Sequence, residues 1–348
     1  MSLLSSISLE FPLVASTWVS ETELVVAGGG GKSKTGVPNS VVLLRSSPND
    51  PLSVVYKMNF DDMISCLTSD PSRRLVSFCT PSECRIFQLA RASPYFRQSV
   101  LARLPTDEGD QSGIAISATS GALVGFESGS LFHLNVAGAW MKVGTIEKCN
   151  FMNILLSDSD LCISADDSVY IGTFTGILVN LTQFKFPGKI FKKGQYLSSN
   201  LIVFPDLKNS QLVLAEKTSN SWSFREISSS IPGPVTCLAL SPYIFDPSSQ
   251  SMTYSGLIGT GEGVVRGCHV NTAWKRAKLG VKSKKLHYSV TSLSLSDSDS
   301  VKIASVGLEG DVGVWAPSAK SSCLYLITVV VSLFVVIAST AFVLKISK

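Results

Sequence analysis

The sequence predicts an all-β protein, a seven-bladed WD-type β-propeller followed by a single C-terminal transmembrane helix. Three observations predict it: a hairpin pattern that recurs seven times, the scarcity of helix-period apolar patterns before the last segment, and an uncharged apolar stretch near the C-terminus. The chain has 348 residues, which is more than one compact core usually holds, so a repeat architecture is expected.

The repeated unit is a short apolar strand, a small turn that usually contains glycine, and an alternating strand. Clear copies begin at Val124, Ile171, Ile258 and Ser305, and weaker copies lie at Gly28, Ser77 and Leu214. Anchored at the turn entries, residues 28, 79, 125, 172, 215, 259 and 306, the units follow at steps of 51, 46, 47, 43, 44 and 47 residues. Seven units of this length, with four short strands each, are typical of a WD-type propeller.

The strands before these hairpins support the same repeat. Apolar strands close on Ser-Asp or Ser-Pro at residues 67–70, 155–158, 240–242 and 295–297, and the Trp of the WD dipeptide is kept only at Trp315. After Trp315 the sequence continues into the C-terminal apolar segment, so the seventh repeat lacks an outer strand of its own. The alternating residues 7–11 are predicted to supply that strand, which closes the ring and removes two exposed sheet edges.

The C-terminal segment predicts a membrane anchor. Residues 323–344 carry no charge, and at ~1.5 Å per residue they give ~33 Å of helix, enough to cross the ~30 Å hydrocarbon core. The predicted organisation is a propeller over residues 1–318, a juxtamembrane linker over 319–322, a transmembrane helix over 323–344 and a luminal tail over 345–348. The first eleven residues contain no basic residue, and Glu10 interrupts them, so we expect no signal peptide and a cytosolic propeller.

Composition argues against several other classes of protein. The eight cysteines show no framework spacing and no CxxC pair, and the chain has three histidines; this argues for reduced thiols and against a structural zinc site. A net charge of +4 is too small to indicate a nucleic-acid partner. The carboxylate pairs Asp166/Asp167 and Asp158/Asp160 occupy turn positions, where Asp is a routine turn former, so we do not expect catalysis there.

The glycine loop (residues 28–39) is the most informative stretch of the chain. Glycines 28–31 end a β-branched run, and Gly36-Val37-Pro38-Asn39 precedes a second apolar run, so a hairpin is predicted whose turn takes about a dozen residues instead of about four. The run GGGGKS is not a phosphate-binding P-loop, because Val26 stands where the first glycine is required and a strand follows instead of a helix. A loop so rich in glycine is costly to order and needs an ion or a partner to hold it.

A basic run precedes blade seven. Six positive residues fall within eleven positions: Lys275, Arg276, Lys278, Lys282, Lys284 and Lys285. They suit contact with anionic lipid headgroups or an acidic partner surface, and a solvated inter-blade loop explains them equally well. No aromatic residue is interleaved among them in the pattern that nucleic-acid binding favours.

A propeller that begins with AGGGG and continues to TG-apolar-PN, with one C-terminal anchor, resembles the endoplasmic-reticulum exchange factor for the Sar-type small GTPase of the COPII coat. This WD-repeat family includes the mammalian prolactin-regulatory-element-binding protein. The resemblance covers the whole layout, but its specific residues are 24–44 and the anchor.

The resemblance implies a regulator without covalent chemistry, a guanine-nucleotide exchange factor in ER-to-Golgi vesicle transport, and not an enzyme. It implies a potassium-stabilised loop, with Gly28, Gly29, Gly30 and Gly31 offering carbonyl oxygens to the ion and Gly36, Val37, Pro38 and Asn39 promoting exchange. It also implies a single-pass protein of the endoplasmic-reticulum membrane whose itinerary extends to the early Golgi. The chain itself is expected to bind no nucleotide.

One branch of these proteins leaves an alternative open: a non-catalytic propeller scaffold that assists membrane cargo such as transporters to leave the endoplasmic reticulum. The retained Gly36 and Asn39 favour the exchange factor.

Overall fold

The computed structural model describes residues 2–316, apart from residues 32–35, 48–49, 94, 104–107, 109–110, 118–120, 136, 151, 158–159, 220, 229–230, 247–250, 274, 283–284 and 297–300. The predicted linker 319–322, transmembrane helix 323–344 and tail 345–348 lie outside the described residues, as does Lys284. No helix among the residues described is long and apolar enough to cross a membrane.

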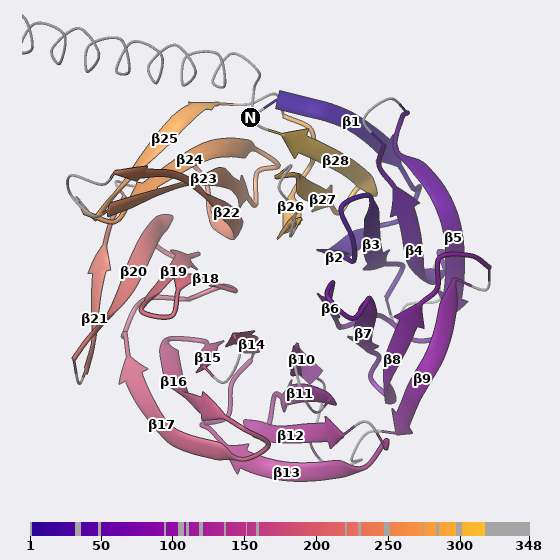
Figure 1. The fold of residues 1–348 in the computed structure, drawn as a ribbon, viewed down its shortest axis with the longest axis horizontal. Coiled ribbons are helices and arrows are strands. Elements are labelled where there is room, and N and C mark those ends of the chain that lie inside the picture. The colour runs from indigo at the N-terminus through magenta and orange to yellow at the C-terminus, as the bar shows by residue number, and fades with distance from the viewer. Residues whose placement is uncertain are drawn as a thin grey trace, which may run out of the picture.

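In the described residues, twenty-eight strands form seven four-stranded antiparallel sheets, arranged as blades around a common centre (Figure 1). Blade one is β2(Leu13–Trp18), β3(Glu23–Gly28), β4(Asn39–Arg45) and β5(Ser53–Phe60). Blade two is β6(Cys66–Asp70), β7(Leu75–Cys79), β8(Glu83–Leu89) and β9(Phe96–Arg103). Blade three is β10(Gln111–Ser117), β11(Gly121–Phe126), β12(Ser130–Asn135) and β13(Trp140–Thr145). Blades four and five are β14(Met152–Ser157), β15(Asp160–Ala165), β16(Ser168–Phe174) and β17(Leu178–Lys185); and β18(Gln195–Ser198), β19(Leu201–Asp206), β20(Gln211–Thr218) and β21(Ser221–Glu226). Blade six is β22(Val235–Asp246), β23(Ser251–Thr260), β24(Val265–Asn271) and β25(Arg276–Lys282), and blade seven is β26(Val290–Leu295), β27(Ile303–Gly307), β28(Asp311–Ala316) and β1(Ser2–Ser8). The predicted all-β, seven-bladed propeller is confirmed.

The N-terminal strand closes the ring, as predicted. β1 pairs antiparallel with β28, from Ser2 opposite Ala316 to Ser8 opposite Asp311. The predicted bounds, residues 7–11, were wrong: the strand ends at Ser8, because Glu10 takes a left-handed backbone (φ 60°) that interrupts the extended chain.

Two of the seven predicted repeat anchors were also placed on the wrong hairpin. The hairpins from Ile171 and Leu214 join the third and outer strands of blades four and five, whereas in the other blades the anchors mark the turn between the second and third strands. The matching turns in these two blades follow Ala165 and Asp206. The spacing of the predicted anchors stays nearly constant in these two blades although the anchors lie on the wrong hairpin, because both kinds of hairpin combine an apolar strand with a short turn.

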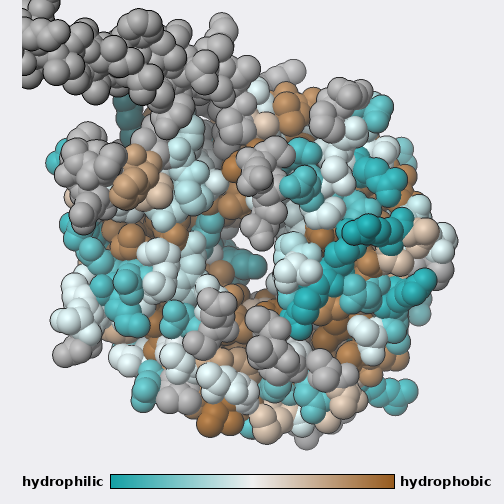
Figure 2. Space-filling model, in the orientation of Figure 1, coloured by the Kyte–Doolittle hydropathy of each residue, from teal (hydrophilic) through white to brown (hydrophobic). Residues whose placement is uncertain are grey.

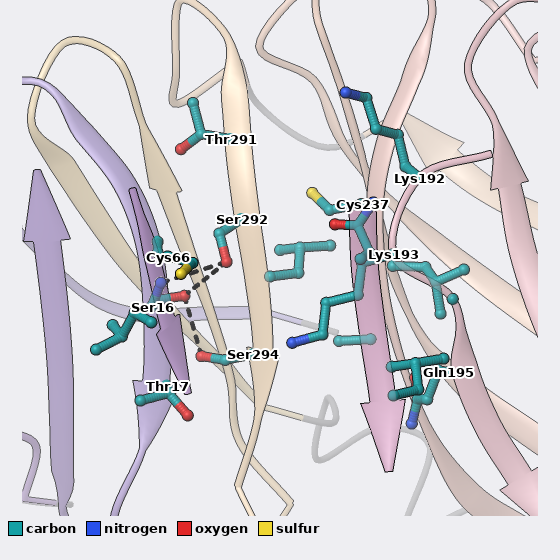
Figure 3. Close-up of a pocket in the computed structure, with 18 of the residues that line it drawn as sticks. Ser16, Thr17, Cys66, Lys192, Lys193, Gln195, Cys237, Thr291, Ser292 and Ser294 are labelled. Carbon is teal, nitrogen blue, oxygen red and sulfur yellow. Dashed lines mark hydrogen bonds between the residues drawn. The ribbon is translucent and has the colours of Figure 1, made fainter. Parts of the chain in front are cut away.

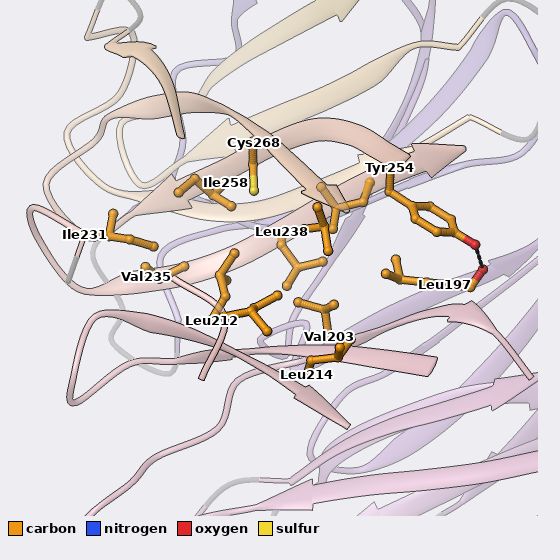
Figure 4. Packing of buried hydrophobic residues seen from close by; sticks show 13 residues of the cluster. Leu197, Val203, Leu212, Leu214, Ile231, Val235, Leu238, Tyr254, Ile258 and Cys268 are labelled. Carbon is orange, nitrogen blue, oxygen red and sulfur yellow. Dashed lines mark hydrogen bonds between the residues drawn. The ribbon is translucent and has the colours of Figure 1, made fainter. Parts of the chain in front are cut away.

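Among the described residues the core consists of seven apolar clusters, one between each pair of neighbouring blades. The cluster between blades five and six joins Val203, Leu212 and Leu214 to Leu238 and Ile258 (Figure 4). The cluster between blades seven and one joins Val312 and Val314 to residues of β2, β3 and β4. Each blade thus buries both of its faces, which explains why the second and third strands read as continuous apolar runs.

Antiparallel order assigns every connection to one of two faces of the disc. Turns between second and third strands, and connections from one blade to the next, share the face that carries the glycine loop; we call this the loop face. The other face carries the remaining turns and the paired residues Ser2 and Ala316, and we call it the exit face. The last described residue therefore lies on the face opposite the glycine loop.

Candidate functional site

The glycine loop is the long turn of blade one, as predicted. Eleven residues separate the paired residues Gly28 and Ser40, whereas the equivalent turns of the other six blades leave two to five residues between the last paired residues. Residues 32–35 of the loop lie outside the described part. The insertion rises from a rigid blade, which is where functional loops are usually found.

Asn39 fastens the base of this loop. Its Oδ1 accepts a hydrogen bond from Gly31 N at 3.1 Å, and its Nδ2 donates to the Gly31 carbonyl at 3.4 Å and to the Asp61 carbonyl at 3.3 Å. The residue is 4% exposed. One buried amide thus joins the loop entry, the loop exit and the connection from blade one to blade two. The sequence predicts an Asn39 side chain that projects from the disc with the loop, and this prediction is wrong, because the side chain is buried and hydrogen-bonded to the propeller.

Two glycines at the loop entry are required by close approach of the backbone. Gly28 belongs to β3, and a Cβ there would collide with the Pro12 carbonyl, which also accepts a hydrogen bond from Gly29 N at 2.8 Å. Gly29 has φ 146°, and a Cβ on it would collide with Cα and Oδ1 of Asn39. Part of the glycine run is therefore explained by the fold, while its role as an ion-binding segment stays a prediction.

The exit of the loop divides into an exposed part and an anchored part. Gly36 and Pro38 are exposed, whereas Val37 is half-buried against the apolar cluster between blades seven and one. The next residue, Ser40, is fully buried and donates to Asn59 Oδ1 at 2.8 Å. The four predicted exchange residues are thus brought together, with Gly36 and Pro38 accessible to a partner and Asn39 positioning them.

The described groups at the loop base suit an alkali cation in their chemistry, since they are oxygen donors. The carbonyl oxygens of Gly31 and Asp61 converge on one amide, and carbonyl oxygens are the groups with which proteins replace the hydration shell of potassium. Among the residues described, no cluster of three or more His, Cys, Asp and Glu side chains forms a metal site.

The part of the basic run that the structure describes is not gathered into one patch. Lys275 lies in the turn before β25 on the exit face and pairs with Glu216, while Arg276 and Lys278 are exposed along β25. Lys282 ends that strand, and Lys285 lies beyond it, with its Nζ 5.8 Å from the centre of the Tyr288 ring. The strand therefore spreads these charges from one face of the disc to the other.

A buried hydrogen-bonded group in blade seven was missed by the sequence reasoning. His287 Nδ1 lies 2.8 Å from Glu309 Oε1 and its Nε2 lies 2.8 Å from Ser305 Oγ, which accepts a hydrogen bond from Trp315 Nε1 at 2.9 Å. The order carboxylate, imidazole, hydroxyl is that of a hydrolase triad. Ser305 is fully buried and His287 is 2% exposed, so no substrate reaches the hydroxyl, and the group joins four segments of blade seven.

The carboxylate pair Asp166/Asp167 lies in a turn, as expected. Asp166 has φ 47° and its Oδ2 accepts hydrogen bonds from Asn150 N at 2.9 Å and Asn150 Nδ2 at 3.3 Å. Asp158 lies outside the described residues. The Asp166/Asp167 pair thus shapes a turn.

His287 leads to a prediction about the pH dependence of stability. Burial lowers the pKa of His287 below its ordinary 6.5, although Glu309 acts in the opposite direction. At pH values between the folded and the unfolded pKa, the unfolded chain therefore binds more protons than the folded chain. The free energy of unfolding then falls as pH drops below about 6.5, by at most about 1.4 kcal/mol per pH unit. Chemical denaturation between about pH 7 and about pH 5 should show a shallower dependence for His287→Gln than for the wild type.

Two other sets of groups bear on that experiment. Burial also lowers the pKa of His269, so part of the dependence should remain in His287→Gln. The carboxyls of Glu23, Asp70 and Asp206 have pKa values below their ordinary 4.5, 3.8 and 3.8, because their hydrogen bonds outweigh the opposing effect of burial; their contribution is lost at lower pH. An unchanged dependence in His287→Gln contradicts the assignment.

Comparison with known proteins bears on the fold. No protein-family model matches the chain, and no curated protein matches it in sequence. Among solved structures it is similar to the WD40 β-propeller domain of Doa1, with a TM-score of 0.65 and 11% sequence identity over 91% of this chain and 97% of that one. The similarity shows a seven-bladed WD40-type propeller, and at this identity it shows the fold alone.

Proposed function

We propose that this chain is a membrane-anchored guanine-nucleotide exchange factor that activates a Sar-type small GTPase at the endoplasmic reticulum to start COPII vesicle formation. The observation that carries the proposal is the glycine loop, an eleven-residue turn where the equivalent turns of the other six blades have two to five residues. Its buried Asn39 holds Gly36 and Pro38 at the surface. The sequence resemblance rests on the same residues.

The loop would act by differential affinity. A rigid loop that makes more contact with the nucleotide-free GTPase than with the GDP-bound form shifts the GTPase towards release of GDP. The reaction requires no acid, base or nucleophile from this chain. The exposed exit of the loop would contact the GTPase, while Asn39 and Val37 hold that exit against the propeller.

A potassium ion fits this proposal as a means of stiffening the loop. When bound, the ion would supply a positive charge that fixes carbonyl oxygens which otherwise repel one another. Gly29, Gly30 and Gly31, with the Asp61 carbonyl, are the residues that would hold it; Gly28 is already part of β3. Ion binding to the folded loop alone stabilises it by mass action.

The two faces of the disc suit a membrane protein of this kind. The chain leaves β28 at Ala316 on the exit face, so a membrane anchor over residues 323–344 would place the exit face towards the bilayer and the loop face towards the cytosol. Lys275 is on the exit face and Arg276 follows it, and both would lie near anionic headgroups.

The test is a loop-shortened variant in which residues 29–39 are replaced by residues 80–83 of blade two, Thr-Pro-Ser-Glu. Both stretches are bracketed by paired residues, Gly28 with Ser40 and Cys79 with Cys84, so the exchange preserves the hairpin ladder. We expect stimulated GDP release to fall to the intrinsic rate of the GTPase. If this variant keeps full activity, the loop has no part in the reaction.

The second candidate is the scaffold that assists cargo exit, which the propeller fold favours because its blades present broad binding surfaces. It predicts that the wild type leaves GDP release unchanged.

A further inference from the structure

The centre of the disc holds a cavity that the proposed function does not use. Its volume is about 770 Å³, and it is lined by the innermost strands β2, β6, β10, β14, β22 and β26 and by residues 192–196. The space-filling view shows the disc hollowed at this centre (Figure 2). Cavities of roughly 300–1,000 Å³ hold small-molecule ligands in proteins.

One wall of the cavity carries a cluster of hydroxyl groups. Ser16 Oγ lies 3.2 Å from Ser292 Oγ and donates to Ser294 Oγ at 3.1 Å, and Ser16 N donates to Ser292 Oγ at 3.3 Å. These side chains come from β2 and β26, the innermost strands of two neighbouring blades. Hydroxyl groups can turn their protons towards an acceptor, so the wall can present several donors to one anion.

Lys193 reaches towards this wall from the opposite side. In the close-up its side chain points across the cavity in the direction of Ser294 and Ser16 (Figure 3). Its position is fixed by the backbone: Lys192 N donates to the Pro205 carbonyl at 3.0 Å, and a Cβ on Gly194 would lie 2.6 Å from the Phe204 ring. Lys193 is solvent-exposed within the lining of the cavity, so its ammonium group is accessible to a ligand that enters the cavity.

The charged side chains among the described lining residues of the cavity are all positive. The lining residues include Lys192 and Lys193 and, among the residues described, no Asp or Glu. Desolvation lowers the pKa of Lys193, and the negative charge of a Cys66 thiolate would act in the opposite direction. Because no carboxylate among the described lining residues neutralises this cation, an anionic ligand would stabilise it.

We propose that the central cavity is a binding site for a small soluble phosphorylated molecule, with Lys193 pairing with a phosphate group and the hydroxyls of Ser16, Ser292 and Ser294 donating to its oxygens. The ligand must be compact, because the innermost strands of the blades surround the cavity around the axis of the disc. This site does not involve the glycine loop, so the binding proposal and the proposed exchange activity are tested separately.

Calorimetric titration of the full chain in detergent tests the proposal, with inorganic phosphate, pyrophosphate and inositol hexakisphosphate as probes. The three probes separate recognition of a single phosphate from recognition of a polyphosphate of matching size. We expect at least one to bind the wild type, and Lys193→Gln to weaken that binding by about tenfold or more, as loss of a charge-assisted hydrogen bond predicts.

Two variants control the experiment. Lys193→Arg keeps the charge and should bind within a few-fold of the wild type, and Lys208→Gln removes an exposed lysine of the loop face and should change nothing. Equal binding by Lys193→Gln and the wild type overturns the proposal, as does a wild type that binds none of the three probes. Thermal melting without the probes checks that Lys193→Gln is folded. If Lys193→Gln is unfolded, two other variants test the proposal: Lys193→Arg should bind the probe like the wild type, and Ser294→Ala should bind it more weakly.

Discussion

Removal of β1 should cost the propeller a large part of its stability. Without Ser2–Ser8, the β28 edge, with its buried Val312 and Val314, loses its partner. Ile7 also packs on the cluster between blades seven and one, and its burial together with several strand hydrogen bonds amounts to at least about 3 kcal/mol. Since a domain of this kind is stable by only about 5–15 kcal/mol, chemical denaturation should show a marked shift of the midpoint or outright aggregation.

Point variants on the same strand control for the deletion. Ile7→Ser should reproduce part of the loss, whereas Leu4→Ser, at a residue 54% exposed beside a bulge in the β1–β28 register, should change stability by no more than about 0.5 kcal/mol. A deletion variant that unfolds at the wild-type midpoint would show that the ring is not closed by β1.

Asn39→Ala should abolish most nucleotide exchange and should also weaken the fold. The variant loses three hydrogen bonds at a buried position and leaves the Gly31 and Asp61 carbonyls without their amide partner. Loss of such partners costs about 1–3 kcal/mol. The loop would then be free at its base, and its exposed exit would no longer be held against the propeller. Stimulated GDP release and the unfolding midpoint are the two measurements.

The neighbouring Ser40→Ala variant separates these two effects. Ser40 is also buried in β4, and its hydroxyl bonds to Asn59 instead of to the loop. It should lose about 1 kcal/mol of stability while keeping exchange activity. If Asn39→Ala and Ser40→Ala exchange nucleotide equally well, Asn39 has no role beyond packing.

The architecture could be predicted because its causes are local. Apolar strands with short turns recur along the chain, and the alternating N-terminal residues match the missing strand of blade seven. The register within blades four and five could not be predicted, because the inner and outer hairpins there share one pattern. What distinguishes them is burial on both faces, as at β15 and β19, which depends on neighbouring blades.

The site could be predicted only in part. The length of the glycine loop and its position in blade one follow from the sequence. The inward direction of Asn39 does not, because one of its partners, Asp61, lies 22 residues away. The same holds for His287, Ser305 and Trp315, and for Lys193, whose surroundings come from distant blades.

The rate of GDP release from a Sar-type GTPase, measured by labelled-nucleotide fluorescence with the full chain in liposomes, tests the central claim most directly. We predict that the wild type accelerates release by at least about tenfold, which corresponds to an activation free energy lower by ~1.4 kcal/mol, and that the loop-shortened variant, folded to the same extent, does not. Release at the intrinsic rate in the presence of the wild type would contradict the account and leave the propeller as a scaffold.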